Sequence, residues 1–232
     1  MISASRRLAA GDCKTRPKSI HASIVMPLPR AQPIIPTLRK QPFDDPDWLF
    51  DFKYDGFRGL CYVERHRGRF ISRNGNHLAR FDKLGEGLAA VLDLDEAILD
   101  GEVIAADATG RPQFYDLIRR TQEPAYVAFD ILWADGTDLR LLPLSERRQR
   151  LHSVLPEGSA VVSEALSVEG RGRHFFELTQ SYDLEGIVAK RLADPYAPRA
   201  HWLKIKNLGY SQKEGRGELF NGPPRGAGPR HS

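Results

Sequence analysis

The sequence predicts a mixed fold of strands and helices in which strands outnumber helices, a pattern that agrees with an α+β class. Most apolar segments between residues 45 and 206 are short, and Gly, Asn or Asp separates many of them, which is typical of strands joined by tight turns. Few segments have apolar residues at helical spacing, and residues 78–92 are the longest of these. With 232 residues, of which 41% are hydrophobic and 28% charged, the chain can bury a sizeable core.

The strand pattern runs through the whole central part of the chain. The expected strands are 48–53, 57–64, 69–72, 97–106, 125–133, 160–165, 185–191 and 202–206. We expect turns at 66–68 and at Asn74-Gly75. Two strands carry costly acids: Asp100 and Glu102 flank a glycine, and Asp130 lies in an almost continuous apolar run. A buried carboxylate must be paired or must bind something.

Four segments are expected to be helical. They are residues 78–92, 114–120, 146–155 and 169–182. Ser145 is a suitable N-cap for the third helix. We expect Arg147, Arg148 and Arg150 on the solvated side of that helix.

Basic charge is concentrated at the start of the chain. Residues 1–40 hold eight Lys or Arg and one acid, a net charge of +7, so the remainder is at −3 for a total of +4. We expect residues 1–28 to be a basic disordered tail, followed by a Pro-rich strap on the domain surface. Such an arm attracts a phosphate backbone but is equally typical of a solvated tail, and both interpretations remain open.

Cysteine content and hydropathy indicate in which cellular compartment the protein is expected. Cys13 and Cys61 have unrelated contexts, which predicts neither a disulfide framework nor a metal site and favours a reducing cytosol. No apolar run approaches the roughly 18 residues of a membrane span, so we expect no membrane association.

Lys53 is the residue with the most unusual position. It directly follows an apolar strand, where lysine is seldom placed without a reason. It could be a nucleophile, although a free lysine amine, with a pKa of about 10.4, is protonated and unreactive until its surroundings change that value. It could equally be a surface lysine in a turn made by Asp55-Gly56.

Other charged residues at strand positions favour the first interpretation. The lysines are Lys190, Lys204 and Lys206, the carboxylates are Glu102, Asp130 and Glu185, and Arg73 adjoins a tight turn. Lysines along one strand face repel each other unless an anion such as a triphosphate lies between them. Carboxylates would hold a divalent cation or ribose hydroxyls. An amine near other ammonium groups loses its proton more easily, which suggests attack by a lysine on phosphorus.

Several short motifs resemble those of one family. They are Lys-x-Asp-Gly-x-Arg at 53–58, Ser-Arg-Asn-Gly at 72–75, Asp-Gly-Glu at 100–102, Phe-Asp-Ile-Leu at 129–132, Glu-Gly-Ile-Val-Ala-Lys at 185–190 and Trp-Leu-Lys-x-Lys at 202–206. Together, in this order, they resemble the adenylation (nucleotidyltransferase) domain of ATP-dependent DNA ligases, in particular the bacterial end-joining type. Each motif is weak alone; read singly, Phe129 and Val188 are more often core residues.

The resemblance implies a role for each matching residue. Lys53 would form the covalent lysyl-AMP, with Lys204 and Lys206 as further catalytic residues that neutralise the α-phosphate together with Lys190. The implied nucleotide-binding residues are Asp51 at the adenine edge, Arg58 and Glu102 at the ribose, Phe129 and Val188 on the adenine faces, and Lys190. Glu185 would help to hold the metal, and Arg73 would meet the 5′-phosphate of a nick.

The resemblance also implies a fold and a setting. The fold would be two packed antiparallel β-sheets with flanking helices, the covalent nucleotidyltransferase (ATP-grasp-like ligase) fold, with the nucleotide in the cleft between them. The expected division is a tail at 1–28, the adenylation domain at 29–207, and a truncated linker with a Gly/Pro/Arg tail at 208–232, without an OB-fold domain.

The implied cofactors are ATP and Mg²⁺ (or Mn²⁺), and the implied partner is nicked double-stranded DNA. A further candidate partner is a repair protein that supplies the missing OB-fold or DNA-binding function. The implied location is the bacterial cytoplasm, in association with the nucleoid. Two alternatives remain: an RNA ligase or capping-type guanylyltransferase, and an inactive truncated remnant that binds nicks or a partner.

Overall fold

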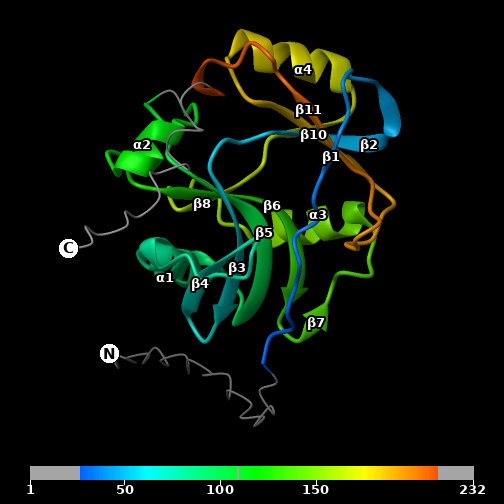
Figure 1. Cartoon of the computed structure of the whole chain (residues 1–232). Helices are drawn as coiled ribbons and strands as arrows, with labels where there is room; N and C mark the ends of the chain where they lie inside the picture. Colours follow the sequence, from blue (N-terminus) through cyan, green and yellow to red (C-terminus); the bar gives the residue numbers. More distant parts are fainter. Residues whose placement is uncertain (1–26, 109, 214–232) are drawn as a thin grey trace, which may run out of the picture.

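The fold consists of two β-sheets with helices against them (Figure 1). The computed structural model describes residues 27–108 and 110–213. The strands are β1 (Thr37–Leu38), β2 (Asp45–Phe52), β3 (Phe57–Glu64), β4 (Arg67–Ser72), β5 (Glu96–Ile104), β6 (Ala125–Ala134), β7 (Thr137–Asp138), β8 (Val162–Glu164), β9 (Ser167–Gly170), β10 (Gly186–Arg191) and β11 (Trp202–Lys206). The helices are α1 (Asp82–Val91), α2 (Phe114–Arg119), α3 (Leu144–Val154) and α4 (Gly172–Ser181), with 3₁₀ turns at Ala79–Phe81 and Ser211–Lys213.

The two sheets share no strand. One has the order β1-β11-β10-β2-β9, and the other has the order β4-β3-β5-β6-β7, with β8 also pairing with β6. Pairing is antiparallel except for β1 with β11 and β6 with β8. This is the expected α+β architecture of two antiparallel-rich sheets.

Each sheet buries its outer face against helices. Phe50 of β2 and Ile187 of β10 pack with Phe175 of α4. The larger core lies on the β3–β6 sheet and includes side chains of α1 and α3, such as Leu88 and Leu151. In Figure 1, α4 accordingly lies beyond β10 and β11, and α1 lies beside β4. The inner faces of the two sheets are therefore left to form the cleft.

The segment before β1 connects the two sheets. The backbone amide of Ala31 donates to Tyr62 Oη of β3 (3.0 Å). The amide of Ile34 donates to Tyr196 Oη (3.4 Å), and Thr37 then pairs with β11. The predicted Pro-rich strap is thus present, and Figure 1 shows it running from the lower sheet to the upper one. The predicted tail at 1–28 lies outside the described residues up to Met26.

Helix α3 differs from the prediction in two ways. It begins at Leu144, and its N-cap is Pro143 without a side-chain hydrogen bond, so Ser145 is not the cap. Arg147 and Arg148 are buried, and only Arg150 is exposed as expected. Arg147 Nε and Nη2 bond to both oxygens of Asp130, at 2.8 and 2.9 Å, which answers the need of that buried carboxylate for a partner.

Smaller differences occur at element boundaries. The β3–β4 hairpin turns at Arg65 and His66, both with positive φ, rather than at 66–68. The segment predicted as helix 169–182 begins as strand β9, and α4 starts only at Gly172, because Gly170 takes a φ of +74° that a helix does not allow.

The expected boundary at residue 207 falls inside the packed part of the chain. Tyr210 Oη donates to Asp55 Oδ2 (2.8 Å), and Gln212 Oε1 accepts from the amide of Phe114 (3.0 Å). The remainder of the predicted tail, from residue 214, lies outside the described residues. Within the described part of the chain, every helix is too short or too polar to span a bilayer.

Candidate active site

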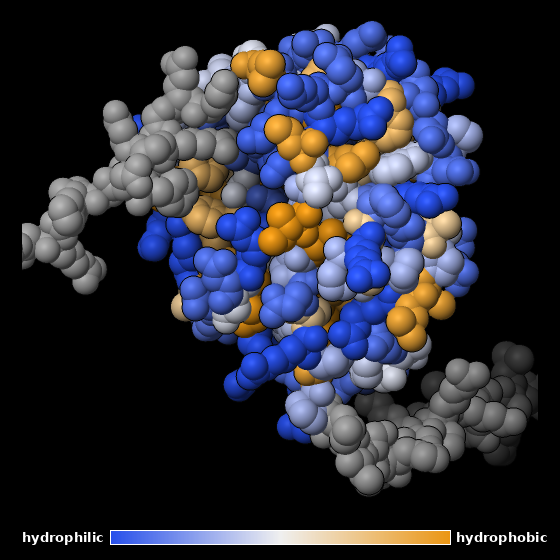
Figure 2. All heavy atoms as spheres, turned by 45° about the vertical axis from the view of Figure 1, so that its right-hand side comes forward, coloured by the Kyte–Doolittle hydropathy of each residue, from blue (hydrophilic) through white to orange (hydrophobic). Residues whose placement is uncertain are grey.

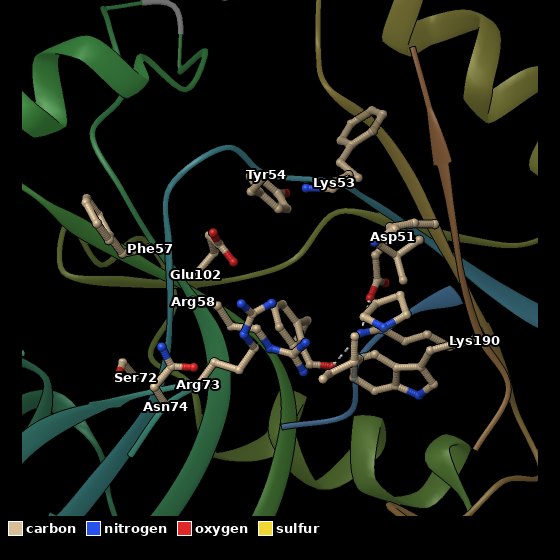
Figure 3. Close-up of a pocket in the computed structure, with 17 residues that line it drawn as sticks. Asp51, Lys53, Tyr54, Phe57, Arg58, Ser72, Arg73, Asn74, Glu102 and Lys190 are labelled. Carbon is tan, nitrogen blue, oxygen red and sulfur yellow. Dashed lines mark hydrogen bonds and ion pairs between the residues drawn. The ribbon is translucent and has the colours of Figure 1, made fainter. Parts of the chain in front are cut away.

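A cavity of about 590 Å³ lies between the sheets (Figure 3). Its walls include nine of the predicted site residues: Asp51, Lys53, Arg58, Arg73, Glu102, Phe129, Val188, Lys190 and Lys204. Ile35 and Pro36 of the strap and Trp202 of β11 also line it. Segments distant in the sequence thus converge on one pocket.

Strand alternation explains this convergence. In β10, Ile187 and Ala189 pack toward α4, so Val188 and Lys190 point to the cleft. The same alternation in β11 turns Leu203 and Ile205 outward and Lys204 inward. Residues two positions apart in a strand therefore point to the same face, and Lys190 of β10 and Lys204 of β11 point to the cleft.

Lys53 is held beside a carboxylate. Its backbone amide bonds to the carbonyl of Gly186 (2.8 Å), where β2 ends next to the start of β10. Its Nζ lies 2.6 Å from Glu185 Oε2, and both side chains are partly buried. The bonded neighbour of the amine is thus Glu185, rather than the ammonium groups of Lys204 and Lys206.

Glycines within the motifs are required by close backbone packing. A Cβ on Gly56 would lie 2.1 Å from the carbonyl oxygen of Val103, and one on Gly101 would lie 2.4 Å from that of Val127. Gly186 has a φ of +140°, and its Cβ would lie 2.1 Å from the carbonyl oxygen of Ile205. These positions let the strands that carry Lys53, Glu102 and the end of β10 approach closely.

Arg58 is fixed by a carboxylate beneath the pocket. Its Nε and Nη2 bond to the two oxygens of Asp100, at 3.1 and 2.7 Å, and Nη1 bonds to the carbonyl of Ile34. Tyr196 Oη donates to the same Asp100 (2.7 Å). The first acid of Asp-Gly-Glu therefore positions Arg58, and the second, Glu102, opens into the pocket.

Glu102 has a changed protonation equilibrium. Burial raises the pKa of Glu102 to about 7, against the opposing effect of the positive charges of Lys53 and Arg58. Near neutral pH, this carboxyl group exchanges between an acceptor and a donor form, so its charge responds to whatever binds in the pocket.

The opposite end of the pocket is a buried ion pair between aromatic rings. Lys190 Nζ lies 2.5 Å from Asp51 Oδ2 and 4.1 Å from the ring centres of both Phe129 and Trp202. Burial lowers the pKa of Lys190, while Asp51 opposes this shift. Lys190, expected at the α-phosphate, is thus at Asp51, away from Lys53 (Figure 3).

Two predicted residues are set apart from the pocket wall. Lys206 is exposed and does not line the cavity. Glu185 does not line it either, but it forms an ion pair with Lys53, which does. Arg73 is exposed at the rim formed by the end of β4, next to Ser72 and Asn74 (Figure 3). The spacing of Lys204 and Lys206 indicated a common face, but could not show that only Lys204 reaches the cavity.

Sequence patterns missed several residues that build the site. Trp202 was noted only within its motif, and Tyr196 and Asp100 had no predicted structural partner. Arg148 was expected in solvent, yet it bonds to the carbonyl oxygen of Phe129 (3.0 Å). A signal existed for Asp100, because a buried acid needs a cation, but the sequence did not show that the cation is Arg58.

The carboxylates fit a metal ion that is held partly by a substrate. The described residues contain no group of three or more His, Cys, Asp or Glu that could hold a metal alone. Mg²⁺ usually binds through one or two carboxylates together with substrate phosphates and water. Glu185, beside Lys53, is a carboxylate of the kind that would serve in this way.

The pocket lies between two sheets and is lined by a lysine that follows one strand and by a lysine on the strand opposite. Carboxylates of the sequence motifs lie beside them. This arrangement is that of a covalent nucleotidyltransferase domain. The comparisons agree with this class. The model of the "ATP dependent DNA ligase domain" family matches residues 31–206, and the chain belongs to this family. It is the adenylation domain of an ATP-dependent DNA ligase.

Two bacterial proteins are among the relatives that resemble this chain. The chain is 32% identical over 185 residues to the SPbeta prophage-derived DNA ligase-like protein LigB of Bacillus subtilis, covering 75% of this chain and 66% of that protein. It is 32% identical over 164 residues to the multifunctional non-homologous end joining protein LigD of Mycolicibacterium smegmatis, covering 68% of this chain and 21% of that protein. The chain thus spans less than two thirds of the length of each.

The same relationship holds between the structures. The mycobacterial DNA ligase D solved with ATP and MES superposes with a TM-score of 0.66 at 26% identity, covering 76% of this chain and 60% of that one. The ligase domain of M. tuberculosis LigD gives a TM-score of 0.66 at 27% identity, covering 75% of this chain and 59% of that one. The two-sheet fold is therefore that of LigD ligase domains.

Proposed function

We propose that this chain transfers AMP from ATP to the 5′-phosphate at a DNA nick through a lysyl-AMP intermediate. Lys53 Nζ attacks the α-phosphorus, a P–N bond forms, and the P–O bond to pyrophosphate breaks. The 5′-phosphate then takes AMP from the lysine and restores the free amine. The observation that supports this most is the position of Lys53, beside Glu185 in a pocket whose opposite strand carries Lys204.

The phosphates are proposed to lie between Lys53 and Lys204. Positive charge from Lys204, with Lys206 further along the same strand face, would neutralise the α-phosphate as the leaving group departs. Glu185 would hold Mg²⁺ or Mn²⁺, which when bound would reduce the repulsion between the phosphates and the incoming amine. Before the metal binds, Glu185 holds the amine of Lys53 in place by its 2.6 Å ion pair.

The nucleoside is proposed to lie deeper in the same pocket. Phe129 and Val188 would contact the two faces of adenine, near Asp51, and Arg58 and Glu102 would contact the ribose. Lys190 was expected to neutralise the α-phosphate. We now propose that it acts at the base end, where its ion pair holds Asp51.

The DNA substrate is proposed to approach the rim. Arg73 is exposed beside the pocket and would meet the 5′-phosphate of a nicked duplex. LigD is named as a non-homologous end joining protein, and a role in DNA repair in the bacterial cytoplasm, on the nucleoid, is the corresponding proposal for this chain. A repair protein that supplies an OB-fold function remains part of that proposal.

Self-adenylation tests the proposed chemistry. The protein is incubated with α-labelled ATP and Mg²⁺ or Mn²⁺, and a covalent, acid-labile label is expected on the wild type but not on Lys53→Ala. Excess unlabelled ATP should suppress labelling much more than GTP. Stronger competition by GTP would favour a capping-type guanylyltransferase. Absence of label on a folded wild type would favour an inactive remnant, and sealing of a nicked duplex against nicked RNA would separate DNA from RNA ligase activity.

A further inference from the structure

The buried guanidinium of Arg148 joins the base end of the pocket to both sheets. Although α3 is rich in charged residues, Arg148 is only 8% exposed. Its Nη1 bonds to the carbonyl oxygen of Phe129 (3.0 Å), and Nη2 bonds to the carbonyl oxygen of Ala165 (3.1 Å) and to Ser167 Oγ (3.2 Å). Nη2 also pairs with Glu164 Oε1 at 2.9 Å.

These partners belong to separate parts of the fold. Phe129 and Glu164 lie on β6 and β8 of one sheet, and Ser167 lies on β9 of the other. Ser167 is the register partner of Asp51 on β2. One planar group therefore fixes the aromatic wall of the pocket relative to the strand that carries its buried carboxylate.

Asp51 is the group on which this arrangement acts. It is 2% exposed and lies between two cations, with Oδ2 2.5 Å from Lys190 Nζ and Oδ1 3.9 Å from Arg148 Nη1. Oδ2 is taken up by the short contact with Lys190, whereas Oδ1 has no hydrogen-bond partner within the described part of the chain. A buried carboxylate with unused acceptor capacity at a pocket wall is suited to receive an N–H donor from a ligand.

We propose that Arg148 is a positioning residue that sets nucleotide affinity and base selectivity by holding Asp51 and Phe129 at the base end of the pocket. This inference rests on the proposed function. Adenine presents an exocyclic amine, which donates to a carboxylate, whereas guanine presents a carbonyl oxygen at that position, which a carboxylate repels. The contacts of Arg148 are with Phe129, Ala165, Glu164, Ser167 and Asp51, and none of those between described residues is with Lys53. Arg148 therefore acts on binding and not on phosphoryl transfer.

The test compares Arg148→Gln with Arg150→Gln, a change at an exposed arginine of the same helix. We expect Arg148→Gln to raise the KM for ATP in self-adenylation at least tenfold, to lower the preference for ATP over GTP, and to leave kcat at saturating ATP within about twofold. Arg150→Gln should match the wild type. Arg148→Lys keeps the charge but loses the planar guanidinium group that bonds to several acceptors at once, so its KM for ATP should lie between those of the other two variants. Titration calorimetry with ATP should show the same loss of affinity.

Further outcomes separate the two proposals. If wild type and Arg150→Gln take no label, the proposed function fails. If the wild type is labelled but Arg148→Gln keeps its KM and its ATP preference, or loses only kcat, the role of Arg148 is wrong while the proposed function stands. Should Arg148→Gln not fold, Glu164→Gln, which removes one partner of the same guanidinium, should raise the KM for ATP about two- to threefold, and an unchanged KM would overturn the inference.

Discussion

Among single residues, Glu102 has a protonation equilibrium that depends strongly on the fold. Its pKa, raised to about 7 by burial, lies above the usual value of 4.5. Between these values the folded protein binds a proton that the unfolded chain has already released. The free energy of unfolding should therefore fall as pH rises from about 4.5 to about 7.

Glu102→Gln tests this dependence, because glutamine is neutral at every pH. Thermal unfolding from pH 5 to pH 8 should show the variant gaining stability over the wild type as pH rises, with little difference near pH 5. Parallel curves across this range would mean that Glu102 is ionised throughout, and that burial does not control its charge.

Some site residues could be predicted from the sequence, and others could not. The motifs indicated Lys53, Glu102 and Lys204 because their residue types and spacing carry the chemistry, and the pocket brings these residues together. Arg148 could not be recognised, because its acceptors Phe129 and Ala165 lie on strands remote from α3 in the sequence. A helical pattern reports which side chains share a face, not which carbonyl groups reach them.

Among the secondary-structure elements, the loop from β2 to β3 depends on one glycine. A Cβ on Gly56 would lie 2.1 Å from the carbonyl oxygen of Val103, a backbone atom that cannot move aside easily. Gly56→Ala should lower the free energy of unfolding by about 1–3 kcal/mol or more, measured by urea titration, and should displace the Lys53 loop.

A matched substitution is available at Gly87 in α1. There a Cβ would meet only Val161 side-chain atoms, at 3.5 Å or more. Gly87→Ala should stabilise the helix by roughly 0.5–1 kcal/mol, since alanine loses less backbone entropy. If both alanine variants were equally stable, the close approach of β3 to β5 would not explain Gly56.

Helix α3 is attached to β6 by the ion pair of Arg147 with Asp130, both fully buried. Asp130→Ala leaves a buried charge unpaired and should cost about 3–5 kcal/mol in unfolding free energy. The double change Asp130→Leu with Arg147→Met should cost less than this single change, as denaturant titration would show. Equal costs for the two would mean that the lost charge pairing is not the cause.

Element types were predicted more reliably than element edges. Residues 202–206 form β11 as predicted, since apolar and polar residues alternate there without a breaker. The expected helix start at residue 169 was wrong, because Gly170 has a positive φ and ends β9. The spacing of apolar residues in a sequence does not show which backbone conformation a glycine adopts.

For the molecule as a whole, the strap before β1 closes part of the pocket, because Ile35 and Pro36 line it. The face of the molecule in Figure 2 is largely hydrophilic, and apolar side chains form separate small groups on it. The exposed apolar residues of the described chain include Ile35, Leu141 and Leu208. Such a surface is compatible with a polar, charged partner such as DNA rather than with one large hydrophobic interface.

Charge at the start of the chain gives a prediction about DNA affinity. Residues 1–26 hold five Lys or Arg and one acid. Their removal leaves the described strap intact and should weaken binding to a nicked duplex at low salt, with a smaller slope of log affinity against log salt. Fluorescence anisotropy at several salt concentrations measures this. An unchanged slope would show that these residues do not contact DNA.

The whole proposed reaction depends on Lys53 as the nucleophile. Mass spectrometry of proteolytic peptides after incubation with ATP and Mg²⁺ tests this most directly. We expect one AMP on the peptide that contains Lys53, removed when pyrophosphate is added, and no AMP on Lys53→Ala. AMP on Lys190 or Lys204 instead, or no AMP on a folded wild-type protein, would contradict it.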